Sequence, residues 1–376
     1  MEGGELENFI KVWLEVIAAL CYCYAIRNTI PIGIKRLLFI LPVVCLFLYL
    51  PLNLFSPHLG GTTAFFIAWL ANFKLLLFAF GKGPLSADPA ISLPLFVAVS
   101  CLPIKIQKNP PPNTPLNHQN KETPPPKSHQ NGEIKENPSR KPREGPLNYA
   151  IKGIVVAILV RVYDYSDYIH PKLIIVLYAF HVYFLLELTL AVSAAMARSL
   201  LGIELEPQFN EPYLSTSLQD FWGKRWNLMV SRILHPTVYE PTRNFFGNLI
   251  GRKWATLPAV FGTFVVSAVM HELMFYYLGR VRPTGDITAF FIIHGFCLTV
   301  EIALKKALND KWQLPRYLSG ILTVAFVMTT AFWLFFPKFI ECRIDVRAFE
   351  EYAAVGAWLR NASESALRIW PGHSRS

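Results

Sequence analysis

The sequence is poor in charged residues and lacks the short motifs of several common enzyme classes. Only 16% of its 376 residues are charged, whereas 53% are hydrophobic and 14% are aromatic. It has no G-x-S-x-G nucleophile elbow, no H-E-x-x-H zinc motif and no glycine-rich phosphate loop. The sequence therefore gives no support for a covalent serine or cysteine intermediate.

Metal-binding and export signals are also missing. The six cysteines fall in or beside apolar segments without the spacing of a metal site, so we expect them to be small buried hydrophobes. We expect no metal and no other bound cofactor. The first nine residues, MEGGELENF, are acidic and lack the basic start of a cleaved signal peptide. The first helix is therefore expected to stay in a membrane.

What the sequence does contain is a series of long apolar segments. A helix that crosses a bilayer needs about 20 apolar residues, and in lipid each backbone group must be paired within such a helix. Ile91–Ile104 contains two prolines and is expected to fall short of crossing. We predict an all-α, polytopic membrane helix bundle of eight or nine helices with an internal reaction cavity. The clear segments are Phe9–Ile26, Leu37–Phe55, Thr62–Phe80, Ile151–Tyr163, Leu173–Met196, Leu257–Leu278, Ile287–Leu304 and Leu318–Ile340.

The net charge of +10 does not indicate nucleic-acid binding, because many of the basic residues lie at the ends of apolar segments. The positive-inside rule places such residues on cytoplasmic loops. Lys105–Leu147 is rich in proline, asparagine and lysine, and it cannot bury enough apolar surface to fold. We predict N-terminal membrane helices at 1–104, a disordered cytosolic loop at 105–147, a helical core at 148–340 and a C-terminal tail at 341–376.

One segment, Thr216–Glu240, combines aromatic, basic and amide side chains. On a continuous helix Trp222 and Trp226 would share one face, and Gly223 would lie one turn from Asn227. Asp220 is expected to cap the start of that helix. An interfacial aromatic belt would explain the tryptophans equally well, but it would not explain Asn227.

His271 lies in an apolar run, and an ionisable group at membrane depth usually has a function. A neutral imidazole suits a general base in an apolar cavity. A hydrogen bond between helices is the structural alternative. His294 and Glu301 either line the same cavity or are satisfied by neighbours, and Glu272 either orients a partner or pairs with a base. We expect structural roles for Asn72, Lys74, His181 and Glu187, with Lys74 reaching toward the membrane surface.

Long stretches of the chain resemble plant wax synthases of the membrane-bound O-acyltransferase superfamily. The resemblance covers His58–Ser86, Glu206–Leu234, Val266–Leu278 and His294–Leu308. It implies a multi-pass acyltransferase of the endoplasmic reticulum membrane that esterifies a lipid hydroxyl with acyl-CoA as co-substrate. It also implies that His271 is catalytic and that Asn227 assists it. Members of this family differ in whether they use fatty alcohols, sterols or diacylglycerol as acceptors.

These observations give a working mechanism. Acyl-CoA is expected to enter from the cytosolic side, and its acyl chain to enter an apolar tunnel. Phe264 and Phe275, near His271 on its own helix, favour a flexible long-chain alcohol over a rigid sterol, which would make the product a wax ester. A membrane transporter and a non-catalytic lipid-binding protein are the rival classes. The expected substrate-binding residues are Asp220, Phe221, Trp222, Lys224, Arg225 and Trp226.

Overall fold

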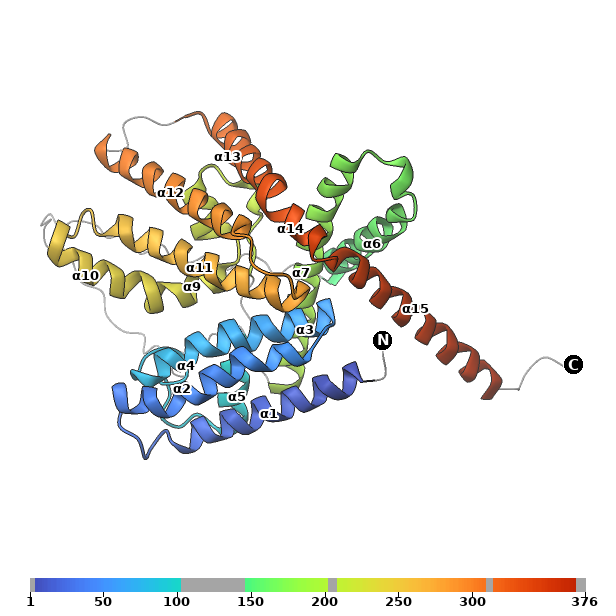
Figure 1. The fold of residues 1–376 in the computed structure, drawn as a ribbon, viewed down its shortest axis with the longest axis horizontal. Helices are drawn as coiled ribbons and strands as arrows, with labels where there is room; N and C mark the ends of the chain where they lie inside the picture. Colours follow the sequence, from blue (N-terminus) through green and yellow to red (C-terminus); the bar gives the residue numbers. More distant parts are fainter. Residues whose placement is uncertain (1–3, 103–145, 202–207, 309–313, 370–376) are drawn as a thin grey trace, which may run out of the picture.

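A computed structural model describes residues 4–102, 146–201, 208–308 and 314–369, and this part of the chain is helical throughout, with short connections (Figure 1). Many of the helices are long and apolar, as the backbone requires in lipid. The longer elements are α1 (Glu5–Ala25), α2 (Ile34–Tyr49), α3 (Pro57–Ala64), α4 (Asn72–Ala79), α5 (Leu93–Cys101), α6 (Pro146–Tyr163), α7 (Pro171–Leu201), α9 (Leu228–Leu234), α10 (Glu240–Ile250), α11 (Thr256–Gly279), α12 (Asp286–Ala307), α13 (Arg316–Thr330), α14 (Phe336–Glu341) and α15 (Ile344–Ile369).

Seven helical stretches in the described residues are long and apolar enough to cross a membrane, which confirms a polytopic helical bundle. They are Glu5–Ala25, Ile34–Asn53, Pro57–Ala79, Pro171–Ser193, Thr256–Gly279, Asp286–Ala307 and Arg316–Glu341. The predicted segment Ile151–Tyr163 lies in α6. Helix α5 has only nine residues. At 1.5 Å per residue it is about 13 Å long, far short of a ~30 Å hydrocarbon core. The predicted disordered loop lies almost wholly outside the described residues.

Helices α1 to α5 form the first layer, at the bottom of Figure 1. One large cluster of buried side chains joins α1, α2, α4 and α5. The sequence predicted that Lys74 reaches toward the membrane surface, and this prediction is wrong. Lys74 is buried, and its Nζ donates to the carbonyl oxygens of Val99 and Leu102 at 2.5 and 2.6 Å. Lys74 therefore satisfies carbonyl groups at the end of α5, and its role is structural.

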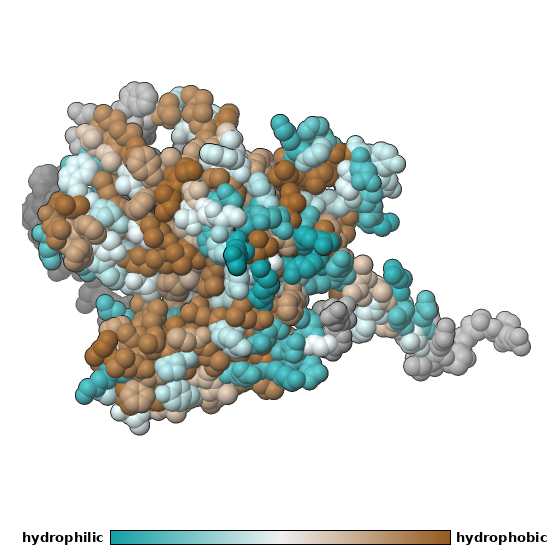
Figure 2. All heavy atoms as spheres, in the orientation of Figure 1, coloured by the Kyte–Doolittle hydropathy of each residue, from teal (hydrophilic) through white to brown (hydrophobic). Residues whose placement is uncertain are grey.

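Part of the outer surface of this layer is apolar. Along α1, Leu6, Ile10, Leu14 and Ile17 are exposed in a stripe, while the opposite face packs into the bundle. In Figure 2 hydrophobic residues cover much of the visible face, and hydrophilic residues gather toward the side where α15 leaves. Such an apolar stripe would be a liability in water, but it suits a surface that faces lipid.

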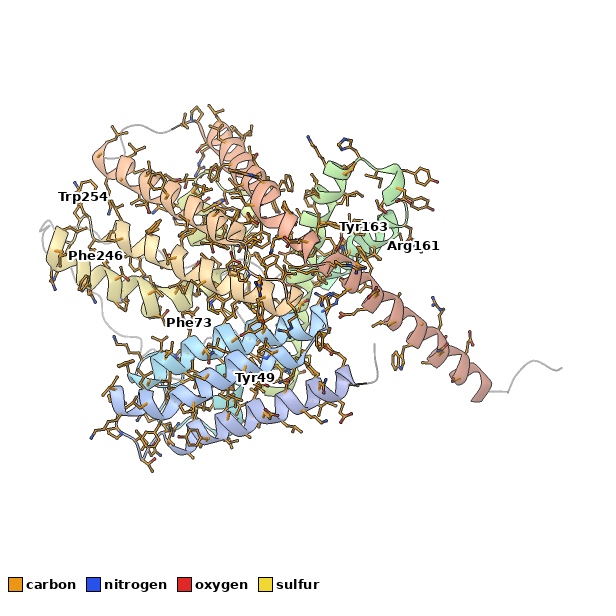
Figure 3. The ribbon with its side chains drawn as sticks, viewed as in Figure 1. Tyr49, Phe73, Arg161, Tyr163, Phe246 and Trp254 are labelled. Carbon is orange, nitrogen blue, oxygen red and sulfur yellow. The ribbon has the colours of Figure 1, made fainter. Side chains whose placement is uncertain are left out.

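Helices α9 to α12 form a second layer above the first (Figure 1). The side chain of Phe73 on α4 lies between the two layers (Figure 3) and packs against a cluster that includes Ile233 and Leu234 of α9. Helices α11 and α12 approach very closely. A Cβ atom at Gly295 would lie only 2.7 Å from Cβ of Phe264. Glycine at this position therefore allows the two helices to touch.

Four stretches of π-helix interrupt the helices of the described chain. They are η2 (Phe65–Ala71), η5 (Phe221–Arg225), η6 (His235–Tyr239) and η7 (Ala331–Phe335). Pro337 follows η7 and has no N–H, so the carbonyl of Trp333 loses its usual helical donor. π-Helical turns widen a helix locally and are frequent at functional sites.

The C-terminal segment, expected to be a tail, contains the long helix α15. Its first turns are fixed to the bundle by Arg347, which donates to the carbonyl oxygens of Phe55 and Leu278, and by Glu351, which pairs with Nδ1 of His58. Burial disfavours the Glu351 carboxylate, but hydrogen bonds from His58 and Ser56 outweigh burial and hold its pKa below the ordinary value. Farther along, α15 projects away from the bundle (Figure 1).

Candidate active site

His271 lies about two-thirds of the way along α11, and one of its ring nitrogens is already committed. Nδ1 lies 2.7 Å from the carbonyl oxygen of Ser267, one turn earlier. Because a carbonyl oxygen can only accept, Nδ1 must carry the proton. Nε2 therefore keeps its lone pair. The side chain is only partly enclosed, so this nitrogen is suited to accept a proton from a bound molecule.

Aromatic rings from three other elements surround His271. Phe291 of α12 lies 4.1 Å from it between ring centroids, Trp69 of η2 lies at 4.9 Å, and Phe335 of η7 lies at 6.3 Å. The rings make the surroundings of the base apolar, and such surroundings limit the access of water. Sequence reasoning missed all three residues, because they come from segments distant in the chain.

Phe264 and Phe275, the two rings expected beside His271, do not contact its ring closely. Phe264 packs edge-on against Trp222, with centroids 5.5 Å apart, and Phe275 packs against Phe335 at 5.1 Å. Both therefore contact other rings of the site and not the ring of His271 itself. The walls around the base are supplied mainly by neighbouring helices.

The segment Thr216–Glu240, called the tryptophan segment below, does not form the continuous helix predicted around Trp222 and Trp226. The short helix α8 (Leu218–Asp220) continues as η5, but Trp226 is extended and Asn227 has a left-handed φ of 43°. Asparagine tolerates this conformation better than most residues. The prediction that Trp222 and Trp226 share one helix face is therefore wrong.

The two tryptophans both contact Phe221, with ring centroids 5.0 and 5.5 Å apart, but their other contacts differ. Trp222 donates from Nε1 to Nδ1 of His294 at 3.1 Å and also lies 6.0 Å from Phe291, which contacts His271. Trp226 stacks on Phe221 at 5.5 Å, with an angle of 13° between the ring planes. Of the two tryptophans, only Trp222 therefore shares a neighbouring ring, Phe291, with His271.

Asn227 caps the N-terminus of α9. Its Oδ1 accepts a hydrogen bond from the backbone N–H of Val230 at 3.4 Å. Its amide nitrogen has no hydrogen-bond partner in the described part of the chain and is free to donate. No hydrogen bond joins Asn227 to His271 among these residues. Two residues after Asn227, Met229 packs against Phe66 and Leu70 of η2, the element that also carries Trp69.

Ser217, and not Asp220, is the N-cap of α8. Its hydroxyl accepts from the N–H of Asp220 at 3.0 Å, and Asp220 in turn accepts from the N–H of Thr216 at 3.2 Å. Asp220 also forms a 2.7 Å ion pair with Arg225. Arg225 donates further to the carbonyls of residues 210 and 211, at 3.2 Å each. Arg225 therefore stabilises the loop, whereas Lys224 is exposed.

His294 is fully buried, and both of its ring nitrogens are occupied. Nδ1 accepts from Trp222, and Nε2 lies 2.7 Å from the hydroxyl of Thr330. That hydroxyl donates to the carbonyl of Phe326 at 2.8 Å, so Nε2 is the donor to Thr330. No lone pair remains for chemistry. The sequence left open whether His294 lines the reaction cavity or is satisfied by neighbours, and these hydrogen bonds show that its role is structural.

The two nearby carboxylates, Glu301 and Glu272, accept hydrogen bonds from residues at the N-terminal ends of helices. Glu301 accepts from the N–H groups of Leu218 and Gln219 at 2.9 and 3.4 Å. Glu272 accepts from the N–H and the hydroxyl of Thr288, at 3.0 Å each. Both lie where the positive end of a helix dipole favours an anion. Neither carboxylate pairs with His271.

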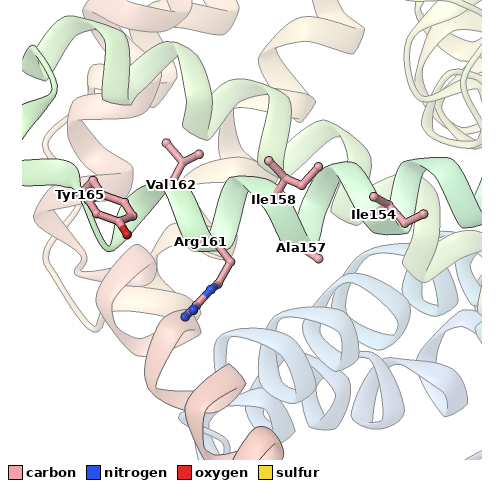
Figure 4. A pocket seen from close by; sticks show the side chains of 6 residues that line it. All are labelled: Ile154, Ala157, Ile158, Arg161, Val162 and Tyr165. Atoms are coloured by element: carbon pink, nitrogen blue, oxygen red, sulfur yellow. The ribbon is translucent and has the colours of Figure 1, made fainter.

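An apolar pocket lies elsewhere, on α6 and the turn that follows it (Figure 4). Its lining residues are Ile154, Ala157, Ile158, Arg161, Val162 and Tyr165. None of them belongs to the group around His271. The internal reaction cavity expected from the sequence stays a prediction.

Comparison with known proteins identifies the family. A sequence profile described as the membrane bound O-acyl transferase family matches residues 205–293. The chain is 50% identical to "Acyl-CoA--sterol O-acyltransferase 1" of Arabidopsis thaliana over 94% of its own length and 96% of that protein. It is 45% identical to "Long-chain-alcohol O-fatty-acyltransferase" of Simmondsia chinensis over 93% of its own length and 94% of that protein. The chain belongs to the membrane bound O-acyl transferase family and is an acyltransferase.

Proposed function

We propose that the protein transfers the acyl group of acyl-CoA to the hydroxyl of a long-chain fatty alcohol, forming a wax ester, in the membrane of the endoplasmic reticulum. The observation that supports this most directly is His271, whose Nδ1 is committed to Ser267 while Nε2 is left as an acceptor. A base of this kind acts directly on the acceptor hydroxyl and requires no enzyme nucleophile.

The reaction then proceeds in one addition and one elimination. Nε2 of His271 takes the proton of the hydroxyl as its oxygen attacks the thioester carbonyl carbon. The carbon–sulfur bond then breaks, and the coenzyme A thiolate leaves with the proton returned by the imidazolium. The apolar rings of Phe291, Trp69 and Phe335 limit access of water, which would otherwise hydrolyse the thioester.

The tryptophan segment supplies the acyl-CoA side of the site in this proposal. The exposed Lys224 is suited to meet the phosphates of coenzyme A, because its charge is not committed to a partner in the described residues. Asp220 and Arg225 hold the segment together, and Phe221 and Trp226 form its stacked aromatic surface. The free amide nitrogen of Asn227 donates toward the reacting carbonyl or the acceptor.

The rings around His271 favour a narrow acceptor. Phe291 lies 4.1 Å from the base and tilts only 30° from its plane, so it covers one face of the imidazole. Trp69 stands at 86° to the imidazole. A flexible alkyl chain can bend past such rings, whereas a rigid four-ring acceptor requires a wide, flat slot. This geometry supports the long-chain alcohol.

A sterol is the second candidate acceptor, because a 50% identical relative is a sterol O-acyltransferase. Microsomes from cells that express the chain should be given labelled acyl-CoA with hexadecanol, a plant sterol and diacylglycerol at matched concentrations. Wax ester as the main product is the expected result. Preferential sterol ester would replace the proposed acceptor and leave the acyltransferase unchanged.

The rival classes are tested with the same preparation. A transporter or a lipid-binding protein would form no ester in any arm and would tolerate replacement of His271. The proposed enzyme should form ester that disappears in His271→Ala at equal expression.

A further inference from the structure

Trp69 carries a buried hydrogen-bond donor that has no acceptor. The side chain is 2% exposed, and its Nε1 has no hydrogen-bond partner among the described residues. Two other indoles of the chain do find partners, since Trp13 donates to Thr63 at 3.2 Å and Trp222 donates to His294 at 3.1 Å. Leaving a buried donor unpaired costs stability, so such a group in a folded protein calls for an explanation.

The position of Trp69 supplies one explanation. Its ring stands edge to face with the imidazole of His271, at 4.9 Å between centroids and 86° between planes. The unpaired donor thus belongs to a ring that contacts the proposed base directly. Trp69 also lies within η2, one of the π-helical stretches, where the local widening displaces side chains from the positions of a regular helix.

We propose that the indole N–H of Trp69 is a catalytic hydrogen-bond donor to the oxygen of the acyl-CoA thioester. This inference rests on the proposed function. As the acceptor oxygen adds to the carbonyl carbon, the carbonyl π electrons move onto its oxygen, which becomes an oxyanion. The Trp69 N–H stabilises that charge while His271 holds the proton of the acceptor. When the carbonyl re-forms, the carbon–sulfur bond breaks and the coenzyme A thiolate receives the proton from His271.

A donor aimed at an oxygen that becomes charged only in the transition state is most effective when it is fixed in advance and kept dry. Trp69 is fixed because it is buried within its helix, and its donor is unpaired only until the substrate is in place. Asn227 is the second donor in the proposed mechanism, and Met229, two residues later, packs against Phe66 and Leu70 of η2, the element that carries Trp69. The two donors would approach the carbonyl from different elements.

The test is Trp69→Phe, which keeps an aromatic ring and removes the N–H. We expect a fall in kcat of about 10²-fold, the usual effect of losing one oxyanion donor, with KM for acyl-CoA little changed. The melting temperature should not fall through loss of a hydrogen bond, because none is lost. The matched control is Trp13→Phe, which removes an indole N–H that is bound to Thr63. This control should lower the melting temperature and leave kcat unchanged.

A binding experiment separates this inference from the proposed function, since it needs no acceptor. Two unreactive acyl-CoA analogues are compared, a ketone that keeps the carbonyl oxygen and a thioether that has no carbonyl. Trp69→Phe should weaken binding of the ketone by up to about tenfold, the effect of losing one hydrogen bond to a neutral carbonyl, and leave thioether binding unchanged. Equal kcat, or equal loss for both analogues, would overturn the role of Trp69. An inactive wild-type protein would instead overturn the proposed function.

Discussion

Replacing His271 by asparagine separates its chemical role from its structural one. The side-chain amide nitrogen of asparagine can take the place of Nδ1 and still donate to the carbonyl of Ser267, which accepts at 2.7 Å in the native protein. Nothing replaces Nε2. The variant should therefore fold and insert normally but lack the proton acceptor.

The size of the effect follows from the surroundings of the base. His294 cannot substitute, because both of its nitrogens are engaged, and Glu272 and Glu301 are bound to helix starts. General acid–base catalysis contributes about 10²- to 10⁴-fold, which is about 2.7–5.4 kcal/mol at 1.36 kcal/mol per tenfold. With no substitute base in the described residues, His271→Asn should lose most of this amount.

His294→Asn is the matched control. Asparagine is too short to bridge Trp222 and Thr330 at once, so a buried group loses its partner. That loss costs about 1–3 kcal/mol of stability. We expect a lower melting temperature, with turnover per folded molecule reduced far less than in His271→Asn.

Both variants should be purified in detergent and assayed for transfer of a labelled acyl group to hexadecanol, with the melting temperature measured on the same samples. Turnover is normalised to folded protein. The general-base assignment is refuted if His271→Asn keeps more than about a tenth of wild-type turnover, since the loss expected of a missing base is at least about 10²-fold.

Four further predictions concern other parts of the structure. Asn227→Asp keeps an oxygen to cap Val230 but loses the amide donor, so kcat should fall with little change in the melting temperature, and a fall in acyl-CoA affinity alone would show a positioning role. Glu351→Gln should destabilise the protein at neutral pH by about 1–3 kcal/mol. The difference should vanish as the pH falls through the lowered pKa of Glu351, because the wild-type carboxylate then becomes protonated as well, and a pH-independent difference would contradict this. Gly295→Ala should cost about 1–3 kcal/mol by forcing its new Cβ against Phe264, where only 2.7 Å is available, and an unchanged melting temperature would argue against the close helix contact. Deleting Lys108–Arg143 should leave ester formation largely intact, whereas an inactive but normally inserted protein would show that the loop acts on the site.

Several predictions from the sequence depended on assuming regular helix geometry, and these account for the main differences. Spacing alone placed Trp222 and Trp226 on one helix face. The helix instead ends at Arg225, because Trp226 is extended and Asn227 has a left-handed backbone. Asp220 was expected to be the cap, whereas Ser217 is. Lys74 was expected to reach the membrane surface, whereas the end of α5 accepts its hydrogen bonds inside the bundle. For Lys74 a partner distant in sequence overrode the local pattern, and for the tryptophans the backbone of one residue, Asn227, did so.

The sequence by itself determined the class of protein, since long apolar segments can exist in lipid only as paired helices and since extended similarity identifies the family. It also predicted a function for His271, because burial of an ionisable group is costly. Only the tertiary structure separated His271 from His294. The two residues differ in which atoms surround them, and those atoms come from η5, α13, η2 and η7, which the sequence does not place together. A free lone pair and an unpaired donor are properties of packing, because each depends on every neighbour that is, or is not, within hydrogen-bond reach.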